Sequence, residues 1–491
     1  MARLTGIQKR LLQEYTRAIV HMRKRFVDSK LSLVFGAGIS KDCGIPEWTK
    51  LIDNLAKDKQ VRGEKLLKKN KSRPITSRTQ VLFHHYAAKR FTGKRGQQLS
   101  DGEVKNEWRN IVRKHLYKNG KTIDDVKNNH PYLTSFLKIV MRSPITVNYN
   151  FDDYIEQILQ SESTTGRIYE TIWDPQLQTK FNNCVIYHPN GFLPKHKMER
   201  QSEGLVFCED EFADQLIESM AGRYAALLHH YSQKTCLFLG LSLEDSTLKH
   251  LLRQSSTLNP GHYHYYVAFQ NSNHGLSTKE KKAIFDANFN LYNLITLFFT
   301  AEEINELGNL LTIQEDQFIS NASIETINLS YCYYIVGSIG AGKSTMISHF
   351  RNLTTHDEWP DFRISELGKD WKKLGKRQKQ KVDNWIASQF CKKNKTLQDA
   401  VQGIHIIDRA PLDPIAFTEP SERASKAQFL FDNICGTQDS LSVKSGHVIF
   451  LYGDPKVMEE RAKSSGKEYD TNQLEEMQKT LKNVYKSESV A

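Results

Sequence analysis

The chain has 491 residues, enough for two or three domains that each bury their own core. Its hydrophobic fraction of 39% and charged fraction of 25% exclude a disordered chain and predict folded domains. No uninterrupted apolar run is long enough to span a bilayer, so we expect a cytoplasmic protein with no membrane partner. The formal net charge of +12 suits anionic partners such as nucleotides or nucleic acid, although we expect most of it to be solvated surface.

Short apolar runs, each followed by a turn or a helical pattern, recur through residues 1–300. They lie at residues 31–35, 145–147, 184–187, 235–239 and 264–269. Such runs are typical of strands in a parallel sheet that helices cover on both faces, so residues 1–300 predict an α/β domain.

Three further stretches of the sequence differ from this pattern or extend it. Residues 57–130 are rich in Lys, Arg and Gln and predict a helical insertion. Residues 301–328 are polar and helix-prone and predict a connection between domains. A further apolar run at 331–336 begins a second predicted α/β domain over residues 329–491.

A glycine-rich turn follows the first strand-like run. It contains Gly36, Ala37, Gly38 and Ser40. Glycines at such a turn let the backbone approach a phosphate, and the helix that follows offers its N-terminal amides. Three polar motifs follow later strand-like runs: Asn150-Phe151-Asp152-Asp153-Tyr154-Ile155-Glu156, His188-Pro189-Asn190-Gly191 and Gly240-Leu241-Ser242-Leu243-Glu244-Asp245.

These four elements, in this order and spacing, resemble the sirtuin-like NADase domains of bacterial anti-phage defence proteins. The resemblance covers residues 1–300 and implies a Rossmann-like, sirtuin-type parallel sheet with NAD as its substrate. It implies that the phosphates contact Gly36, Ala37, Gly38 and Ser40, that Asn150 and Asp152 lie beside the nicotinamide ribose, and that Gly240 and Ser242 line the adenosine side.

In such a site NAD loses nicotinamide through an oxocarbenium-like transition state, and Asn150 would position water or the ribose. An alternative interpretation is that Asn150 and Asp152 cap the helix that begins at Tyr154, and both roles are compatible. The preceding Asn148 has a similar Asn-Tyr context, which leaves a second register open.

Position 190 departs from the pattern of the family. The pattern places a catalytic histidine immediately before Gly191, where this chain has Asn190, and an amide cannot accept a proton near neutral pH. Three explanations are open: a natural variant, a base displaced to His188, or an engineered substitution that preserves NAD binding. The intact motif around position 190 favours the third explanation.

Cysteine spacing disfavours a protein deacetylase. Deacetylase sirtuins carry a four-cysteine zinc module, whereas the seven cysteines of this chain form no Cys-x-x-Cys pair. We therefore expect hydrolysis of free NAD rather than deacetylation.

A second glycine turn follows residues 331–336 and matches the phosphate-binding loop Gly-x-x-x-x-Gly-Lys-Ser. Its residues are Gly337, Gly340, Gly342, Lys343, Ser344 and Thr345. The pattern predicts that backbone amides and Lys343 hold the phosphates of ATP or another nucleotide, with Ser344 as a ligand of Mg²⁺.

Polar residues follow this turn in a recognisable order: Glu366, then Asp408 and Arg409 after an apolar run, then Arg461, Lys463 and Lys467 on a predicted helix. This order resembles the deoxynucleoside kinase and thymidylate kinase group. The resemblance implies Glu366 as the base facing the acceptor hydroxyl, Asp408 and Arg409 at the end of the catalytic strand, and the three later cations as a phosphate-clamping lid.

Two features depart from that group. Leu367 stands where a proline is usual, and the lid carries Ser465 and Lys467 where arginines are frequent. Lysine lacks the bidentate fork of arginine, so we expect weaker phosphoryl transfer.

Together the two resemblances imply an anti-phage defence effector. Its first domain would hydrolyse NAD to ADP-ribose and nicotinamide, and its kinase-like domain would sense or phosphorylate a nucleoside or nucleotide and regulate that activity. The resemblance also implies a homo-oligomer and, as partner, a phage-derived trigger or companion defence protein. Two alternatives stay open: an active nucleoside or nucleotide kinase with a non-catalytic NAD-binding module, and a nucleotide-gated scaffold in which neither site is catalytic.

Overall fold

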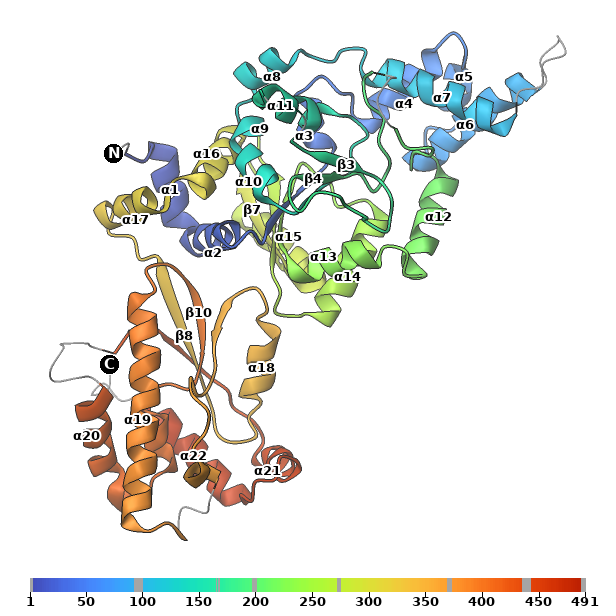
Figure 1. Cartoon of the computed structure of the whole chain (residues 1–491). Helices are drawn as coiled ribbons and strands as arrows, with labels where there is room; N and C mark the ends of the chain where they lie inside the picture. Colours follow the sequence, from blue (N-terminus) through green and yellow to red (C-terminus); the bar gives the residue numbers. More distant parts are fainter. Residues whose placement is uncertain are drawn as a thin grey trace. The chain divides into compact units, whose positions relative to one another are not determined.

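The chain forms two compact units (Figure 1). A computed structural model describes residues 3–91, 100–164, 166, 168–196, 201–271, 275–368, 373–434 and 443–486. The N-terminal unit comprises residues 3–12 and 25–314 of this part, and the C-terminal unit comprises residues 13–24 and 315–486.

The N-terminal unit is built on a seven-stranded parallel sheet in the order β3-β4-β2-β1-β5-β6-β7. The strands are β1 (Leu31–Phe35), β2 (Ile145–Asn148), β3 (Glu170–Ile172), β4 (Val185–Tyr187), β5 (Thr235–Leu239), β6 (His264–Phe269) and β7 (Leu294–Phe299). Every residue of the central strands β1 and β5 is buried, which explains their continuous apolar runs. The predicted parallel sheet is confirmed, and β3 and β7 are additional strands.

Helices surround this sheet and fill the stretch before β2. They are α1 (Gly6–Glu14), α3 (Ala37–Lys41), α4 (Trp48–Lys57), α5 (Glu64–Lys69), α6 (Ile75–Phe91), α7 (Asp101–Leu116), α8 (Ile123–Asn129), α9 (Tyr132–Ser135), α10 (Leu137–Arg142), α11 (Tyr154–Glu162), α12 (Glu209–Met220), α13 (Ala225–Gln233), α14 (Ser246–Leu258), α15 (Thr278–Tyr292) and α16 (Ala301–Thr312). One core packs Val34 and Phe238 of the sheet against Leu227 of α13 and Leu251 of α14. Residues 57–130 are helical over α5, α6, α7 and α8.

The C-terminal unit contains a four-stranded parallel sheet in the order β11-β8-β10-β9. Its strands are β8 (Ser330–Val336), β9 (Thr354–His356), β10 (Gly403–Asp408) and β11 (His447–Phe450). Its helices are α17 (Glu315–Ile324), α18 (Lys343–His349), α19 (Lys376–Asp399), α20 (Arg423–Ile434), α21 (Pro455–Ser464) and α22 (Thr471–Val484), with 3-10 turns at Ser365–Gly368, Asp413–Phe417 and Pro420–Glu422.

Side chains alternate along β8 between two helical layers. Tyr334 and Val336 belong to a core with Leu397 of α19 and Leu481 of α22. Ile335, between them in sequence, packs with α18 instead. This period-two alternation is what a strand covered on both faces requires.

A segment from near the start of the chain completes the C-terminal unit. Helix α2 (Thr16–Val27) contributes residues up to 24 to it. The guanidinium carbon of Arg23 lies 3.9 Å from the ring centroid of Phe318 in α17, and burial lowers the pKa of Arg23 to about 10. His21 Nε2 lies 2.6 Å from the carbonyl oxygen of Asn352.

Among the residues that the structure describes, no helix combines the length and the apolar character needed to cross a bilayer.

Candidate functional site

The carboxyl ends of β1 and β5 lie side by side at the centre of the N-terminal sheet. From β1 the chain moves to β2 on one side, and after β4 it returns to β5 on the other side. In open parallel sheets this reversal creates the crevice in which ligands bind. The glycine turns after β1 and β5 therefore occupy the position at which a dinucleotide site is expected.

These two turns touch each other closely. The amide of Gly36 donates to the carbonyl oxygen of Leu239 at 3.0 Å, and the amide of Gly38 donates to that of Gly240 at 2.9 Å. A Cβ atom on Gly38 would lie 2.9 Å from the Cα of Gly240, and Gly240 has a φ of +69°. Glycine is required at these positions because the turns pack backbone against backbone. Ala37 begins α3 beside them, and Ser242 is exposed after the β5 turn.

Asn150 links the β1 turn to the end of β2. Its Nδ2 donates to the carbonyl oxygen of Gly36 at 2.9 Å and to the Oγ of Ser40 at 2.8 Å. Asn150 is buried, and its own amide donates to Oδ1 of Asn148 at 3.1 Å. The structure thus brings Asn150, Gly36 and Ser40 together.

Asp152 belongs to the same region and also shapes the start of α11. Its Oδ1 accepts from the amide of Tyr154 at 3.2 Å in a local turn, whereas the N-cap residue of α11 is Asp153 and has no side-chain capping bond. Burial raises the pKa of Asp152 to about 6, against the opposing effect of Ser40. Within the described part of the chain, Oδ2 of Asp152 and Nδ2 of Asn148 are buried without a hydrogen-bond partner. Two unsatisfied polar groups at one strand end suit a polar ligand such as the ribose of NAD.

His188 lies next to Asn150, and both of its ring nitrogens are within hydrogen-bond distance of an oxygen atom. Nδ1 is 2.7 Å from the carbonyl oxygen of Asn150, and Nε2 is 2.8 Å from Oε1 of Glu156. Burial alone would lower the pKa of His188, but the Glu156 carboxylate outweighs it and the pKa is raised. The side chain is fully buried, and its contact with the carbonyl oxygen of Asn150 fixes the backbone of that residue.

Asn190 is held by a separate set of polar groups. Its Nδ2 lies 3.4 Å from the carbonyl oxygen of Tyr149 and 3.5 Å from Oδ2 of Asp245, and its Oδ1 accepts from Nε2 of Gln215 at 3.1 Å. Asp245 also accepts from the amide of Leu248 and so caps α14. Burial raises the pKa of Asp245.

Asp245 and Gln215 contact Asn190, and no role was predicted for either of them from the sequence. Asp245 ends the quoted Gly240–Asp245 motif directly before a helical pattern, which is a usable signal for a capping carboxylate. Gln215 lies in the middle of α12, and nothing in its sequence context indicates that it contacts position 190.

The second glycine turn joins β8 to α18 in the C-terminal unit. Lys343 is buried, and its Nζ donates to the carbonyl oxygens of Gly337 at 2.8 Å and Ser338 at 3.0 Å. Burial lowers the pKa of Lys343 to about 8. Gly340 and Gly342 have φ angles of +77° and +90°, which other residues rarely adopt.

Of the predicted magnesium and lid residues, Ser344, Thr345 and Arg461 lie at this turn. Ser344 and Thr345 lie exposed in the first turn of α18. A Cβ on Gly342 would lie 4.0 Å from a guanidinium nitrogen of Arg461 in α21, so this cation reaches the turn. Lys463 instead pairs with Glu459 at 2.6 Å, and Lys467 is exposed beyond α21.

A cluster of charged side chains, buried or partly buried, lies at the end of β10. Arg409 donates to Glu358, lies 3.8 Å from Oδ2 of Asp413, and has a φ of +67°. Lys393 of α19 donates to the carbonyl oxygen of Asp408 at 2.6 Å, and Asp408 itself has a raised pKa because it is buried. Lys343 interacts electrostatically with Asp408, Arg409 and Glu358, which places the cluster beside the glycine turn.

Glu366 does not share this environment. It pairs with Lys381 at 2.6 Å, a contact that lowers its pKa to about 2. Glu358 is the carboxylate that joins Arg409, and sequence reasoning missed it. It follows the short strand β9, whose residues Thr354–His356 carry no apolar signal.

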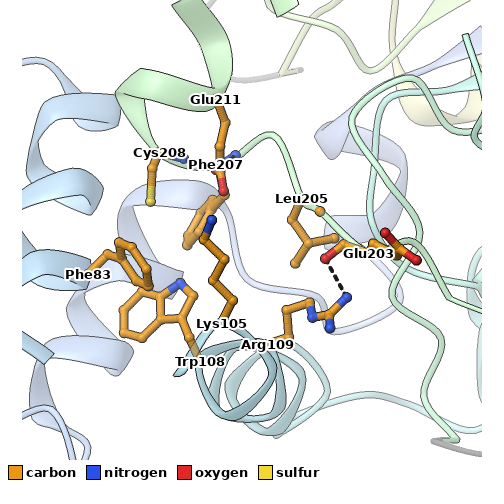
Figure 2. A pocket seen from close by; sticks show the side chains of 10 residues that line it. Phe83, Lys105, Trp108, Arg109, Glu203, Leu205, Phe207, Cys208 and Glu211 are labelled. Carbon is orange, nitrogen blue, oxygen red and sulfur yellow. Dashed lines mark hydrogen bonds between the residues drawn. The ribbon is translucent and has the colours of Figure 1, made fainter. Parts of the chain in front are cut away.

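A small cavity of about 40 Å³ lies elsewhere in the N-terminal unit, among α6, α7 and the start of α12 (Figure 2). Cys208, Asp210 and Glu211 gather at its edge with ligand atoms within 4.8 Å of one another. Glu211 already accepts from the amides of Phe207 at 2.9 Å and Cys208 at 2.7 Å, so it caps α12. Burial raises the pKa of the Cys208 thiol, which disfavours the thiolate that a metal would need.

Comparison with known proteins supports an NAD-related role for the sheet of the N-terminal unit. No curated protein gives a significant match to the chain. Residues 144–294 match the family of the SIR2-like domain. The matched range begins before β2 and ends at the start of β7, so it contains Asn150, Asp152, Asn190 and Asp245. Residues 144–294 of the N-terminal unit are therefore similar to the SIR2-like domain, a type of domain that binds NAD.

Proposed function

We propose that the N-terminal unit hydrolyses NAD to ADP-ribose and nicotinamide. The observation that carries the proposal is the position of Asn150, which joins Gly36 and Ser40 at the reversal point of the sheet. The unsatisfied oxygen of Asp152 lies in the same region. These polar groups at the ends of β1 and β2, of which β2 lies in the range that matches the SIR2-like domain, suit binding of the nicotinamide ribose.

In this mechanism the bond between ribose and nicotinamide breaks and nicotinamide leaves. Water supplies the hydroxyl that replaces it and releases its proton to solvent. Asn150, with its amide fixed by Gly36 and Ser40, orients the ribose or the water. Asp152, with its pKa raised to about 6, is largely ionised at neutral pH and stabilises positive charge that develops on the ribose. His188 and Glu156 hold the backbone of Asn150.

We propose that the C-terminal unit binds ATP or another nucleotide with Mg²⁺. Lys343 at the glycine turn, Arg461 near it and Ser344 at the start of α18 are the residues that would hold the phosphates and the ion. This unit would sense or phosphorylate a nucleoside or nucleotide and thereby control NAD hydrolysis, because uncontrolled loss of NAD harms the host cell. The whole chain would act in anti-phage defence, as a homo-oligomer that answers to a phage-derived trigger or companion protein.

A second candidate function is an active nucleoside or nucleotide kinase with a non-catalytic NAD-binding module. Two observations favour it. The amide of Asn190 is held by Asp245 and Gln215 in place of a catalytic base. The cluster of Glu358, Arg409 and Asp408 places carboxylates and a cation beside the phosphate turn, as phosphoryl transfer needs.

Product analysis separates these candidates. The chain is incubated with NAD and, in a second reaction, with ATP, Mg²⁺ and deoxynucleosides, and products are separated by chromatography. Nicotinamide and ADP-ribose formation that Asn150→Ala abolishes supports NAD hydrolysis. Phosphorylated nucleosides without nicotinamide release support the kinase, and an NAD reaction unaffected by any added nucleoside or nucleotide contradicts the regulatory coupling.

A further inference from the structure

The segment of residues 57–73 in the N-terminal unit concentrates positive charge. It contains eight lysines and arginines and two acidic residues, a net charge of +6 against +12 for the whole chain. All eight cationic residues are exposed: Lys57, Lys59, Arg62, Lys65, Lys68, Lys69, Lys71 and Arg73. We call these eight side chains the basic surface.

The two acidic residues of the segment leave this charge uncompensated. Asp58 is buried, and its Oδ2 accepts from Nζ of Lys114 and lies within hydrogen-bond distance of Nε2 of His115, at 2.8 Å in each case. Burial alone would raise the pKa of Asp58, but its hydrogen bonds outweigh that effect and lower the pKa to about 2. The Asp58 carboxylate therefore neutralises positive charge on α7 rather than on the basic surface. Glu64 lies in the first turn of α5, where it faces the positive end of the helix. Among the described residues, no carboxylate forms an ion pair with any member of the basic surface.

The backbone beneath the basic surface is fixed. The amides of Val61 and Arg62 donate to the carbonyl oxygen of Asp58 at 3.1 and 2.8 Å, and that of Gly63 donates to Ala56 at 2.8 Å. The segment includes α5 and the end of α4, which pack with α6 and α7 in the helical part of the N-terminal unit (Figure 1). A fixed backbone holds these charges at set positions, so only the side-chain stems remain to be ordered on binding.

The chemistry of the segment indicates which polyanion it suits. Its apolar side chains point inward, since Val61 and Leu67 are buried and Leu66 is half-buried, so nothing is available to insert into a lipid layer. It contains no aromatic residue on which an unpaired base could stack. Lysine-rich surfaces of this kind contact phosphates, which lie regularly along a duplex.

We propose that the basic surface binds the phosphate backbone of double-stranded nucleic acid. This site contains no residue of either glycine turn and requires neither NAD hydrolysis nor phosphoryl transfer. The interaction is independent of base sequence, because phosphate contacts carry no sequence information.

The test measures binding of the full chain to fluorescent duplexes of DNA and of RNA by anisotropy at several salt concentrations. The test variant changes four lysines of the basic surface to glutamine, and the control variant changes four exposed lysines elsewhere in the same unit. The test set is Lys65, Lys68, Lys69 and Lys71, and the control set is Lys30, Lys138, Lys180 and Lys279. A third variant carries arginine at the four test positions and keeps the charge.

The test variant is expected to bind duplex at least tenfold more weakly, with the slope of log K against log salt reduced by about 3 to 4 units. The control variant and the arginine variant are expected to bind like the unchanged chain. A preference for DNA or for RNA identifies the natural duplex. The proposal is overturned by no duplex binding at low salt, by equal weakening in the control variant, by tighter binding of single strands, or by tighter binding of anionic vesicles or an acidic peptide.

Discussion

His188 Nε2 lies 2.8 Å from Oε1 of Glu156 in a fully buried pair, and this pair supports the backbone of Asn150. Removing one partner of a buried pair typically costs about 3 to 5 kcal/mol, so Glu156→Gln is expected to lower the free energy of unfolding by that order. Glu162→Gln on the same helix is the control, because that exposed side chain forms only a surface pair with Lys127.

The same pair has a pH signature. The pKa of His188 is raised, so its stabilising contribution is complete below the pKa of the unfolded chain, about 6.5, and is lost as pH rises through the raised value. Urea unfolding of the unchanged chain should therefore show a loss of stability above about pH 6.5 that Glu156→Gln removes. An unchanged pH slope in the variant would contradict the pairing.

Asn190→His is expected to raise NAD hydrolysis by roughly 10²- to 10⁴-fold, the usual effect of a positioned general base. An imidazole titrates near neutral pH and an amide does not. Asp245 lies 3.5 Å from the side-chain nitrogen of Asn190, where a carboxylate can orient the imidazole. Release of nicotinamide is the measurement, and Asn190→Gln, which keeps an amide, is the control. Equal turnover of Asn190→His and the unchanged chain, with NAD binding intact, would sink the idea.

Asp152→Asn is expected to stabilise the N-terminal unit while it impairs NAD hydrolysis. Burial raises the pKa of Asp152 from 3.8 to about 6, so across this range the folded state keeps a proton that the unfolded state releases. The free energy of unfolding therefore falls as pH rises from about 4 to 6, by at most about 3 kcal/mol. The variant lacks this fall, and thermal unfolding at pH 7 measures its gain. Asp214→Asn, at an exposed position of α12, should change nothing.

Glu358→Gln is expected to impair the C-terminal unit far more than Glu366→Gln. Glu358 pairs with Arg409, whose side chain is 12% exposed, whereas Glu366 pairs with Lys381, whose side chain is 59% exposed. Loss of the first carboxylate should lower both the thermal stability of the unit and any phosphoryl transfer from ATP. Calorimetry and a nucleoside phosphorylation assay provide the two readouts. A larger effect at Glu366 would restore the role that the sequence resemblance gave it.

Apolar runs and glycine turns were enough to predict the parallel sheet of the N-terminal unit, because β1 and β5 are buried on both faces and lie directly before their turns. Strands β3 and β9 could not be found in this way, since each has three residues and neither is fully buried. Glu358 follows β9 and was missed for this reason, whereas Glu366 was selected from the kinase resemblance as the base facing the acceptor hydroxyl.

Contacts between elements that are distant in the chain could not be predicted from the sequence either. Gln215 on α12 reaches Asn190 across 25 positions of the chain, and no local pattern marks it. For His188, the sequence indicated a role that the geometry does not favour. Its motif suggested an alternative base, but only the geometry reveals that Glu156 and Asn150 occupy both ring nitrogens.

Residues 13–24 belong to the C-terminal unit although they precede almost the whole N-terminal unit in the chain. During synthesis Arg23 leaves the ribosome roughly 300 residues before its partner Phe318, a delay of about 15 to 60 s at ordinary rates of translation. The basic helix α2 must stay available, unfolded or held by other contacts, until that partner emerges. A fragment that begins at residue 315 would never receive it, so expression of the C-terminal unit alone requires residues 13–24 to be supplied as a second chain or by circular permutation.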